Sequence, residues 1–306
     1  MVQQGLRPNT RRLYATAQRY YQAFCDKYQL VPLPAAEEQI LRFVAYAHTQ
    51  QLSPATISTY LSGIASLHTM QGLPAPPISS YRVKLALKSI VESGPSTNRK
   101  APITYDLLCY MLQQLQPDMC LLWSAMFCLG FYGALRGSEY SAIVEQGTIR
   151  APFISDLSFT YHQQSLAMIY TIRKSKTKRA PIQVPIGCSN TQCCAVCTMQ
   201  HYLVLRSRQG TLHANAFLFV DQAGRPITKQ QLNLEIKRCV ASLGLDTANY
   251  TSHSFRSGAA TSAHQAGFSE TQIKALGHWA SSAYSGYIRQ FDSHAFDLSR
   301  KLTGIH

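Results

Sequence analysis

The sequence predicts a mainly α-helical protein with a small antiparallel β-sheet, divided into two domains. Its 306 residues exceed the size of one average domain. Apolar residues recur at helical spacing through most of the chain, and short strand-like runs occur only in its middle. A polar segment flanked by prolines, 94–102, is typical of a linker. We therefore expect a helical domain at 1–93 and a second domain at 103–306.

Composition and charge narrow the class of partner. The net charge is +14, and 46% of the residues are hydrophobic, so the chain can bury a sizeable core. A basic excess of this size favours a polyanion, with nucleic acid as the default. The N-terminus lacks the apolar core of a signal peptide, and the longest uncharged run, Met119–Leu135, reads as a buried helix. We expect a nuclear or cytoplasmic protein that has no membrane contact and whose nine cysteines are reduced.

The first domain is expected to contain four helices. They start near Thr10, Ala36, Pro54 and Ser80, and prolines separate them. Each helix carries an apolar stripe. On the fourth, two lysines four residues apart, Lys84 and Lys88, fall on an exposed side.

The second domain is expected to combine helices with three short strands. A helix follows Thr104, and an apolar helix that Asp118 could cap reaches Tyr132. Capping boxes at Thr228 and Ser269 open two further helices. The remaining expected elements are strands at 154–160, 166–173 and 181–186, a helix at 195–206 and a short strand at 217–220.

A short region near the end of the chain concentrates chemistry-bearing side chains. It holds His253, Arg256 and His278, followed by two tyrosines, and it contains a single acidic residue. A hydrolase usually needs carboxylates, whereas attack on a phosphodiester needs cations and hydrogen-bond donors around an anion. A tyrosine can attack the phosphorus and hold the product covalently. Because His253 and Arg256 are three residues apart, a helix would present both on one face.

Five features in a fixed order carry a resemblance to a known family. Arg136 stands with Glu139, a lysine-rich turn follows at 173–177, and then come His-x-x-Arg, Gly-His and tyrosine. This order resembles the tyrosine recombinase (phage integrase) family over nearly the whole chain. The stretch 252–302 looks like the end of its Cre-like members. The cysteine usage and the N-terminal half look more like recombinases of eukaryotic mobile elements, the Cryptons and DIRS-type retrotransposons.

The resemblance implies a role for each matched residue. The two arginines would bind the non-bridging phosphate oxygens, Glu139 would support them, His253 would act as acid and base, and His278 would donate a hydrogen bond. The lysine before threonine would protonate the leaving 5′ oxygen, with Lys174 as the second choice. The family spacing favours the second tyrosine over Tyr284 as nucleophile. The implied catalytic set is Arg136, Lys176, His253, Arg256, His278 and Tyr287, supported by Glu139.

The implied activity is site-specific DNA strand cleavage and rejoining, without a cofactor, by a homotetramer on paired sites in double-stranded DNA. The first domain would be the family's core-binding domain. The alternatives are an inactive DNA-binding protein of the same fold and a monomeric enzyme similar to type IB topoisomerases. A helix at 292–302 would dock on its own domain or on a neighbouring protomer. The candidate DNA-binding residues are Lys84, Lys88, Arg99, Lys100, Lys174 and Lys178.

A separate cysteine cluster suggests a second kind of site. A Cys-x-x-Cys pair with a histidine four residues on is compatible with tetrahedral zinc. The more favoured interpretation is buried thiols at a strand–helix junction, because a second well-spaced pair is missing. The zinc alternative would use Cys188, Cys193, Cys197 and His201.

Overall fold

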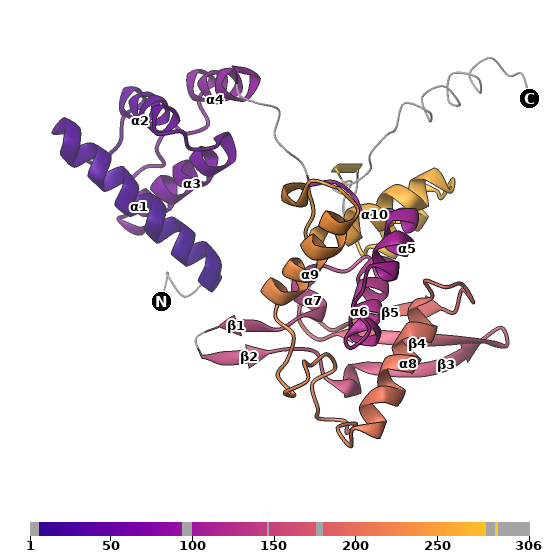
Figure 1. The fold of residues 1–306 in the computed structure, drawn as a ribbon. Helices are drawn as coiled ribbons and strands as arrows, with labels where there is room; N and C mark the ends of the chain where they lie inside the picture. The colour runs from indigo at the N-terminus through magenta and orange to yellow at the C-terminus, as the bar shows by residue number, and fades with distance from the viewer. Residues whose placement is uncertain (1–5, 94–99, 146, 176–179, 280–284, 287–306) are drawn as a thin grey trace, which may run out of the picture. The chain divides into compact units, whose positions relative to one another are not determined.

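The structure is a computed structural model, which describes residues 6–93, 100–145, 147–175, 180–279 and 285–286. The chain forms two compact units, 1–98 and 99–306 (Figure 1). Lys176 and Tyr287 of the expected catalytic set lie outside the described residues, as do Tyr284 and the segment 292–302. Among the described residues, no helix combines the length and the apolar character needed to span a membrane.

The first unit consists of four helices in its described part. Prolines stand at or next to helix starts, and the Ser53 hydroxyl caps α3 by accepting from the Thr56 amide at 3.2 Å. The core is aromatic, and Phe43 packs edge to face with both Tyr21 and Phe24. The helices are α1 (Pro8–Tyr28), α2 (Glu37–Thr49), α3 (Pro54–Met70) and α4 (Tyr81–Ser93).

The second unit is built around one deeply apolar helix, α6 (Cys120–Tyr132), of which most residues are buried. A helix that is apolar all round belongs in a core. It contacts α8 and α10 most extensively. The other helices are α5 (Tyr105–Gln113), α7 (Gly137–Tyr140), α8 (Ala195–Arg208), α9 (Lys229–Ser242), α10 (His253–Gln265) and α11 (Glu270–Leu276).

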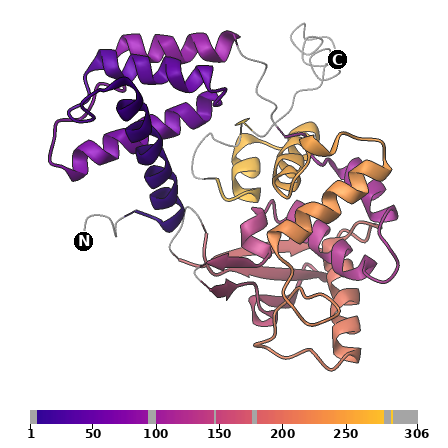
Figure 2. The same cartoon turned by 60° about the vertical axis from the view of Figure 1, so that its left-hand side comes forward.

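Two small antiparallel sheets complete this unit. One pairs β1 (Ile143–Glu145) with β2 (Thr148–Arg150), and the other has the order β3 (Leu157–His162), β4 (Ser165–Ile172), β5 (Ile182–Gly187). Met168 pairs with Ile186 and Tyr170 with Val184, so alternate side chains of both strands share one buried face. Helix α8 contacts β4 and β5, and Figure 2 shows the same arrangement from a second side.

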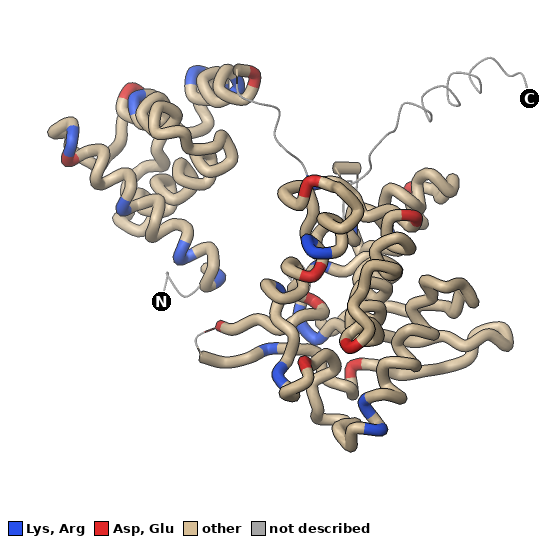
Figure 3. Tube along the Cα trace, viewed as in Figure 1, with Lys and Arg blue, Asp and Glu red and all other residues tan. Residues whose placement is uncertain are grey.

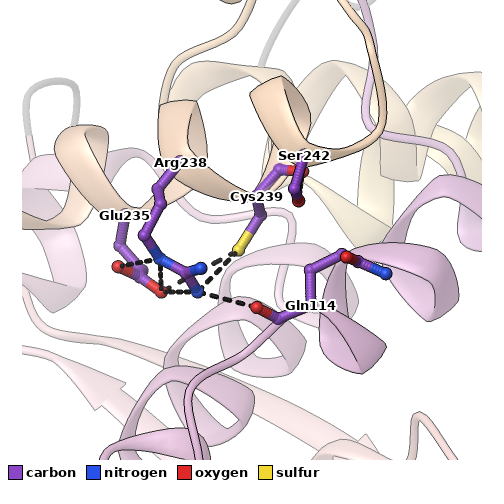
Figure 4. Close-up of polar contacts among 5 residues, drawn as sticks. All are labelled: Gln114, Glu235, Arg238, Cys239 and Ser242. Atoms are coloured by element: carbon purple, nitrogen blue, oxygen red, sulfur yellow. Dashed lines mark hydrogen bonds and ion pairs between the residues drawn. The ribbon is translucent and has the colours of Figure 1, made fainter.

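Arg238, a partly buried residue of α9, contacts the end of α5 (Figure 4). It pairs with Glu235 one turn earlier in α9, with 2.6 Å between Nη2 and Oε1. The same nitrogen donates to the carbonyl of Gln114, the C-cap residue of α5, at 2.8 Å. The contact fixes the end of α5 to α9, the helix that leads into α10.

Several expected details differ in the structure. The pair β1–β2 was not predicted, because its two strands are only three residues long. Residues 217–220 form isolated bridges rather than a strand. Helix α6 begins one residue after Met119, with no side-chain cap, so Asp118 is not its cap. The fold class is confirmed: mainly helical with small antiparallel sheets.

Candidate active site

A tight turn after α6 presents the first candidate arginine. Buried Ala134 has a φ of 44°, in the left-handed region that costs a residue with a Cβ about 1 kcal/mol or more. Its amide donates to the Phe131 carbonyl at 2.9 Å, and the Leu135 amide donates to the Gly130 carbonyl at 3.0 Å. These bonds reverse the chain, so that Arg136 is the N-cap residue directly before α7, at the edge of the core.

Arg136 and Glu139 form a pair that also reaches the lysine turn. The Glu139 carboxylate accepts from the Arg136 side chain and from its backbone amide, both at 2.9 Å. The side chain of Glu139 is 3% exposed and that of Arg136 is 22% exposed, so the pair opens to solvent only on the arginine side. The buried Ser175 hydroxyl donates to the same carboxylate at 3.0 Å. Glu139 therefore orients Arg136 and anchors the chain at Ser175.

Arg256, in the first turn of α10, connects three distant parts of the sequence. Its side chain is buried, with 1% exposure for the residue. Nη1 donates to the carbonyl of Ala134, 122 residues away, and Nη2 donates to the carbonyl of Gly277 at 2.7 Å. Its guanidinium lies 4.2 Å from the centre of the Trp279 ring, within cation–π range. The turn after α6, the start of α10 and the end of α11 thus meet at one charged group.

The end of α11 places His278 in the left-handed region, with φ 53°. Its amide donates to the Ala275 carbonyl at 3.2 Å and the Trp279 amide donates to the Lys274 carbonyl at 3.0 Å, which is the Schellman pattern. Glycine usually occupies this position because it adopts a positive φ without strain. A histidine at this position is therefore less favourable for the stability of the fold.

Gly277, directly before His278, is required by the packing around it. In the structure, a Cβ at this position would lie 1.9 Å from the Trp279 ring. Gly277 therefore makes room for the indole that covers Arg256.

His253 stands at the start of α10, one turn before Arg256, as the sequence predicted. Loss of water around the ring lowers the pKa of His253 below its ordinary value. The positive charges of Arg256, Lys229 and Arg136 lower this pKa further. The neutral imidazole is therefore favoured at neutral pH, which is the form that can accept a proton.

Lys229 is a member of this group that the sequence interpretation missed. It is the first residue of α9, directly after the capping residue Thr228. A Cβ at Gly137 would meet Lys229 Cε at 3.3 Å and Ser252 Oγ at 2.3 Å, so α7, α9 and the start of α10 approach closely at this glycine. The capping box was visible in the sequence, but the sequence does not say where the helix it opens points.

The expected DNA-binding lysines belong to both units. Lys84, Lys88 and Lys174 are exposed, and Lys88 forms a surface ion pair with Glu92 at 3.5 Å. Lys100 donates to the Ala248 carbonyl next to α10. Figure 3 shows basic positions on both units. Arg99 and Lys178 lie outside the described residues, together with the nucleophile and lysine candidates named above.

The four residues named for the zinc alternative do not come together in the structure. Cys193 pairs with Cys109 in a disulfide, whereas the sequence predicted reduced thiols throughout. The partners are 84 residues apart in sequence, so only the packing of the fold brings them together. His201 is exposed on α8 and belongs to no group of potential metal ligands in the described part of the chain. Cys194 instead joins Cys188 and Cys197.

The sequence is similar to those of known proteins. Residues 154–294 match the profile described as the phage integrase family. A protein described as an integrase/recombinase xerD homolog, from Selenomonas ruminantium, is 25% identical over 264 residues, which span 84% of this chain and 74% of the relative.

Solved structures show the same fold. The XerH site-specific recombinase bound to a palindromic difH substrate has a TM-score of 0.66 at 17% identity, covering 96% of this chain and 80% of that one. The Tn1549 transposon integrase in complex with transposon right end DNA has a TM-score of 0.63 at 17% identity, covering 96% and 94%. These matches lead to one conclusion: residues 154–294 are similar to the phage integrase family, and the chain has the fold of the tyrosine recombinases.

Proposed function

We propose that this protein is a site-specific DNA recombinase that cleaves and rejoins strands through a 3′-phosphotyrosine. One observation carries the proposal more than any other. Arg256, buried and bound to the carbonyls of Ala134 and Gly277, gathers Arg136, His253 and His278 from separate elements. Together they form a group of cations and donors with one carboxylate, Glu139, paired to an arginine. Such a group suits a phosphodiester rather than a cationic or apolar substrate.

In the proposed reaction, Arg136 and Arg256 stabilise the charge that develops on the two non-bridging oxygens. Arginine suits this task because its planar fork stays charged and donates two parallel hydrogen bonds. The bonds from Arg256 to backbone carbonyls support this role, because a preorganised donor does not need to reorient as the phosphorane forms. Lys229 adds a further positive charge near His253.

The covalent step exchanges one phosphorus–oxygen bond for another. The Tyr287 oxygen attacks phosphorus, its proton passes to neutral His253, and the bond from phosphorus to the 5′ oxygen breaks. Lys176 protonates the departing 5′ oxygen. Rejoining is the reverse reaction with a 5′ hydroxyl from another strand, so no oxidant, nucleotide or metal is consumed. The contact between Ser175 and Glu139 supports Lys176, because it fixes the preceding residue beside the Arg136 pair.

Double-stranded DNA is the proposed substrate, and the two units would together clamp it. The net charge of +14 and the related structures that contain DNA support this choice. We further propose that four copies assemble on two sites, with the segment 292–302 docking on a neighbouring protomer. Origin in a Crypton- or DIRS-like element remains a prediction of the sequence.

A strand-exchange assay separates the proposal from its alternatives. Two duplexes with different labels are mixed with the full chain, with Tyr287→Phe as the chemically silent variant. The proposal predicts recombinant products from the unaltered chain and binding without cleavage from the variant. Binding without cleavage by the unaltered chain would indicate an inactive DNA-binding protein. Relaxation of supercoiled DNA with no exchange would indicate a topoisomerase-like enzyme.

A further inference from the structure

Three cysteines meet at the junction between the sheet and α8, in a place that the proposed recombination does not use. Cys188 follows the last residue of β5, Cys194 immediately precedes α8, and Cys197 lies in the first turn of that helix. The Cys188 sulfur lies 3.5 Å from the sulfurs of both Cys194 and Cys197. All three sulfurs are within 4.8 Å of one another.

This spacing matches the ligand shell of a thiophilic metal ion. A zinc–sulfur bond of about 2.3 Å in a tetrahedral site places neighbouring sulfurs about 3.8 Å apart. The observed separations of 3.5 Å need only a small expansion to reach this value. A disulfide would need about 2.05 Å and could join only two of the three sulfurs.

The surroundings of the sulfurs resemble those of a metal site. Cys194 is buried, whereas Cys188 and Cys197 are partly exposed, so an ion has a path from solvent. The Ser189 amide donates to the Cys194 sulfur at 3.3 Å. A donor to sulfur of this kind orients a metal-bound thiolate from the outer shell.

We propose that Cys188, Cys194 and Cys197 bind one thiophilic divalent ion of the Zn²⁺ class, with water as the fourth ligand. The bound ion ties the end of β5 to the start of α8, and its role is structural. Three protein ligands and a loop of only five residues between Cys188 and Cys194 make this a compact site. The site is independent of the strand-transfer chemistry, whose steps require no metal.

Cobalt is the probe, because tetrahedral Co²⁺–thiolate complexes have intense visible bands and a sulfur-to-metal charge-transfer band. The full chain, reduced with a phosphine and freed of metal, is titrated with Co²⁺ and then with Zn²⁺. We expect saturation at one Co²⁺ per chain, loss of the bands when Zn²⁺ displaces it, and a melting temperature that rises with Zn²⁺. Cys194→Ser and Cys197→Ser should weaken Zn²⁺ binding more than about 100-fold, beyond the effect of losing an outer-shell partner.

Cys120→Ser is the matched control, because Cys120 is a free, partly exposed thiol outside the cluster. It should bind Co²⁺ like the unaltered chain. Circular dichroism checks the fold of each variant, and Cys188→Ser, at a partly exposed position, serves if the buried Cys194 variant does not fold. Featureless cobalt spectra from the reduced, folded chain would overturn the proposal. Equal Zn²⁺ affinity in the triad variants and the control would also overturn it.

Discussion

The two units of this protein bury polar groups in very different ways. In the described part of the first unit, His68 is the buried polar or charged residue; its Nε2 accepts from the Ala35 amide and its Nδ1 bonds the Ile64 carbonyl, both at 2.9 Å. In the second unit, ten such residues are buried, and most lie near α7 or in the first turns of α10. Buried polar groups lower stability unless they are paired, so their concentration beside Arg256 is consistent with the proposed site in this region.

Removing one arginine from each unit tests this contrast most strongly. Arg256→Ala should lower the DNA cleavage rate about 10²–10³-fold, as loss of a preorganised donor does. It should also lower the free energy of unfolding by about 3 kcal/mol, because two buried carbonyls lose their donor and the Trp279 ring loses its partner. Single-turnover cleavage and urea unfolding measure the two effects.

The control is Arg82→Ala, which removes exposed contacts with Glu37 and Glu38 on the first unit. It should change the unfolding free energy by less than about 1 kcal/mol and leave cleavage unchanged. If Arg256→Ala cleaved at the normal rate while being destabilised, Arg256 would be a structural residue like His68.

The charge around His253 predicts a specific pH dependence. Because the pKa of this histidine is lowered, the neutral form needed as a base persists below pH 6.5, its ordinary pKa. We expect the cleavage rate to stay level as the pH falls through about 6.5 and to decline only below it. Lys229→Ala removes a positive charge, so the pKa of His253 should rise and the decline should begin at higher pH. An identical acid limb in both proteins would separate Lys229 from the site.

Each unit contains a residue with a φ of 53°, and replacing it with glycine gives a smaller and more selective test of the contrast between the units. His278→Gly relieves the φ of 53° and should raise the unfolding free energy by about 0.5–1 kcal/mol while reducing cleavage. Gln29→Gly, at the exposed end of α1 with the same φ, should stabilise by a similar amount and leave cleavage intact. Equal activity in both variants would show that the His278 imidazole is dispensable.

Exposed lysines on α4 give the smallest expected effect. Lys84→Ala and Lys88→Ala should each reduce the slope of log affinity against log salt by about 0.9 if each neutralises one DNA phosphate. The cleavage rate on bound DNA should not change. Because Lys88 is paired with Glu92, its effect should be the smaller of the two. Slopes equal to that of the unaltered chain would exclude α4 from the DNA contact surface.

Local patterns predicted the helices, and they were less informative about the site. Capping signals at Ser53, Thr228 and Ser269 matched the observed helix starts, because capping acts between neighbouring residues. The ordered motif predicted Arg136, His253, Arg256 and His278 as site residues. It did not reveal that Arg256 is buried under Trp279, nor that Lys229 joins them, because both facts depend on how distant helices pack. The exchange of Cys193 for Cys194 in the cysteine cluster has the same cause.

The most direct test of the central claim is to capture the covalent intermediate. A nicked DNA substrate whose cleaved 5′ fragment diffuses away traps the chain on the 3′ end. Proteolysis and mass spectrometry then identify the linked peptide. We expect an adduct on Tyr287 in the unaltered chain and in the Tyr284→Phe variant, and no adduct in the Tyr287→Phe variant. An adduct on Tyr284, or no adduct on DNA that the protein demonstrably binds and recombines, would contradict the assignment.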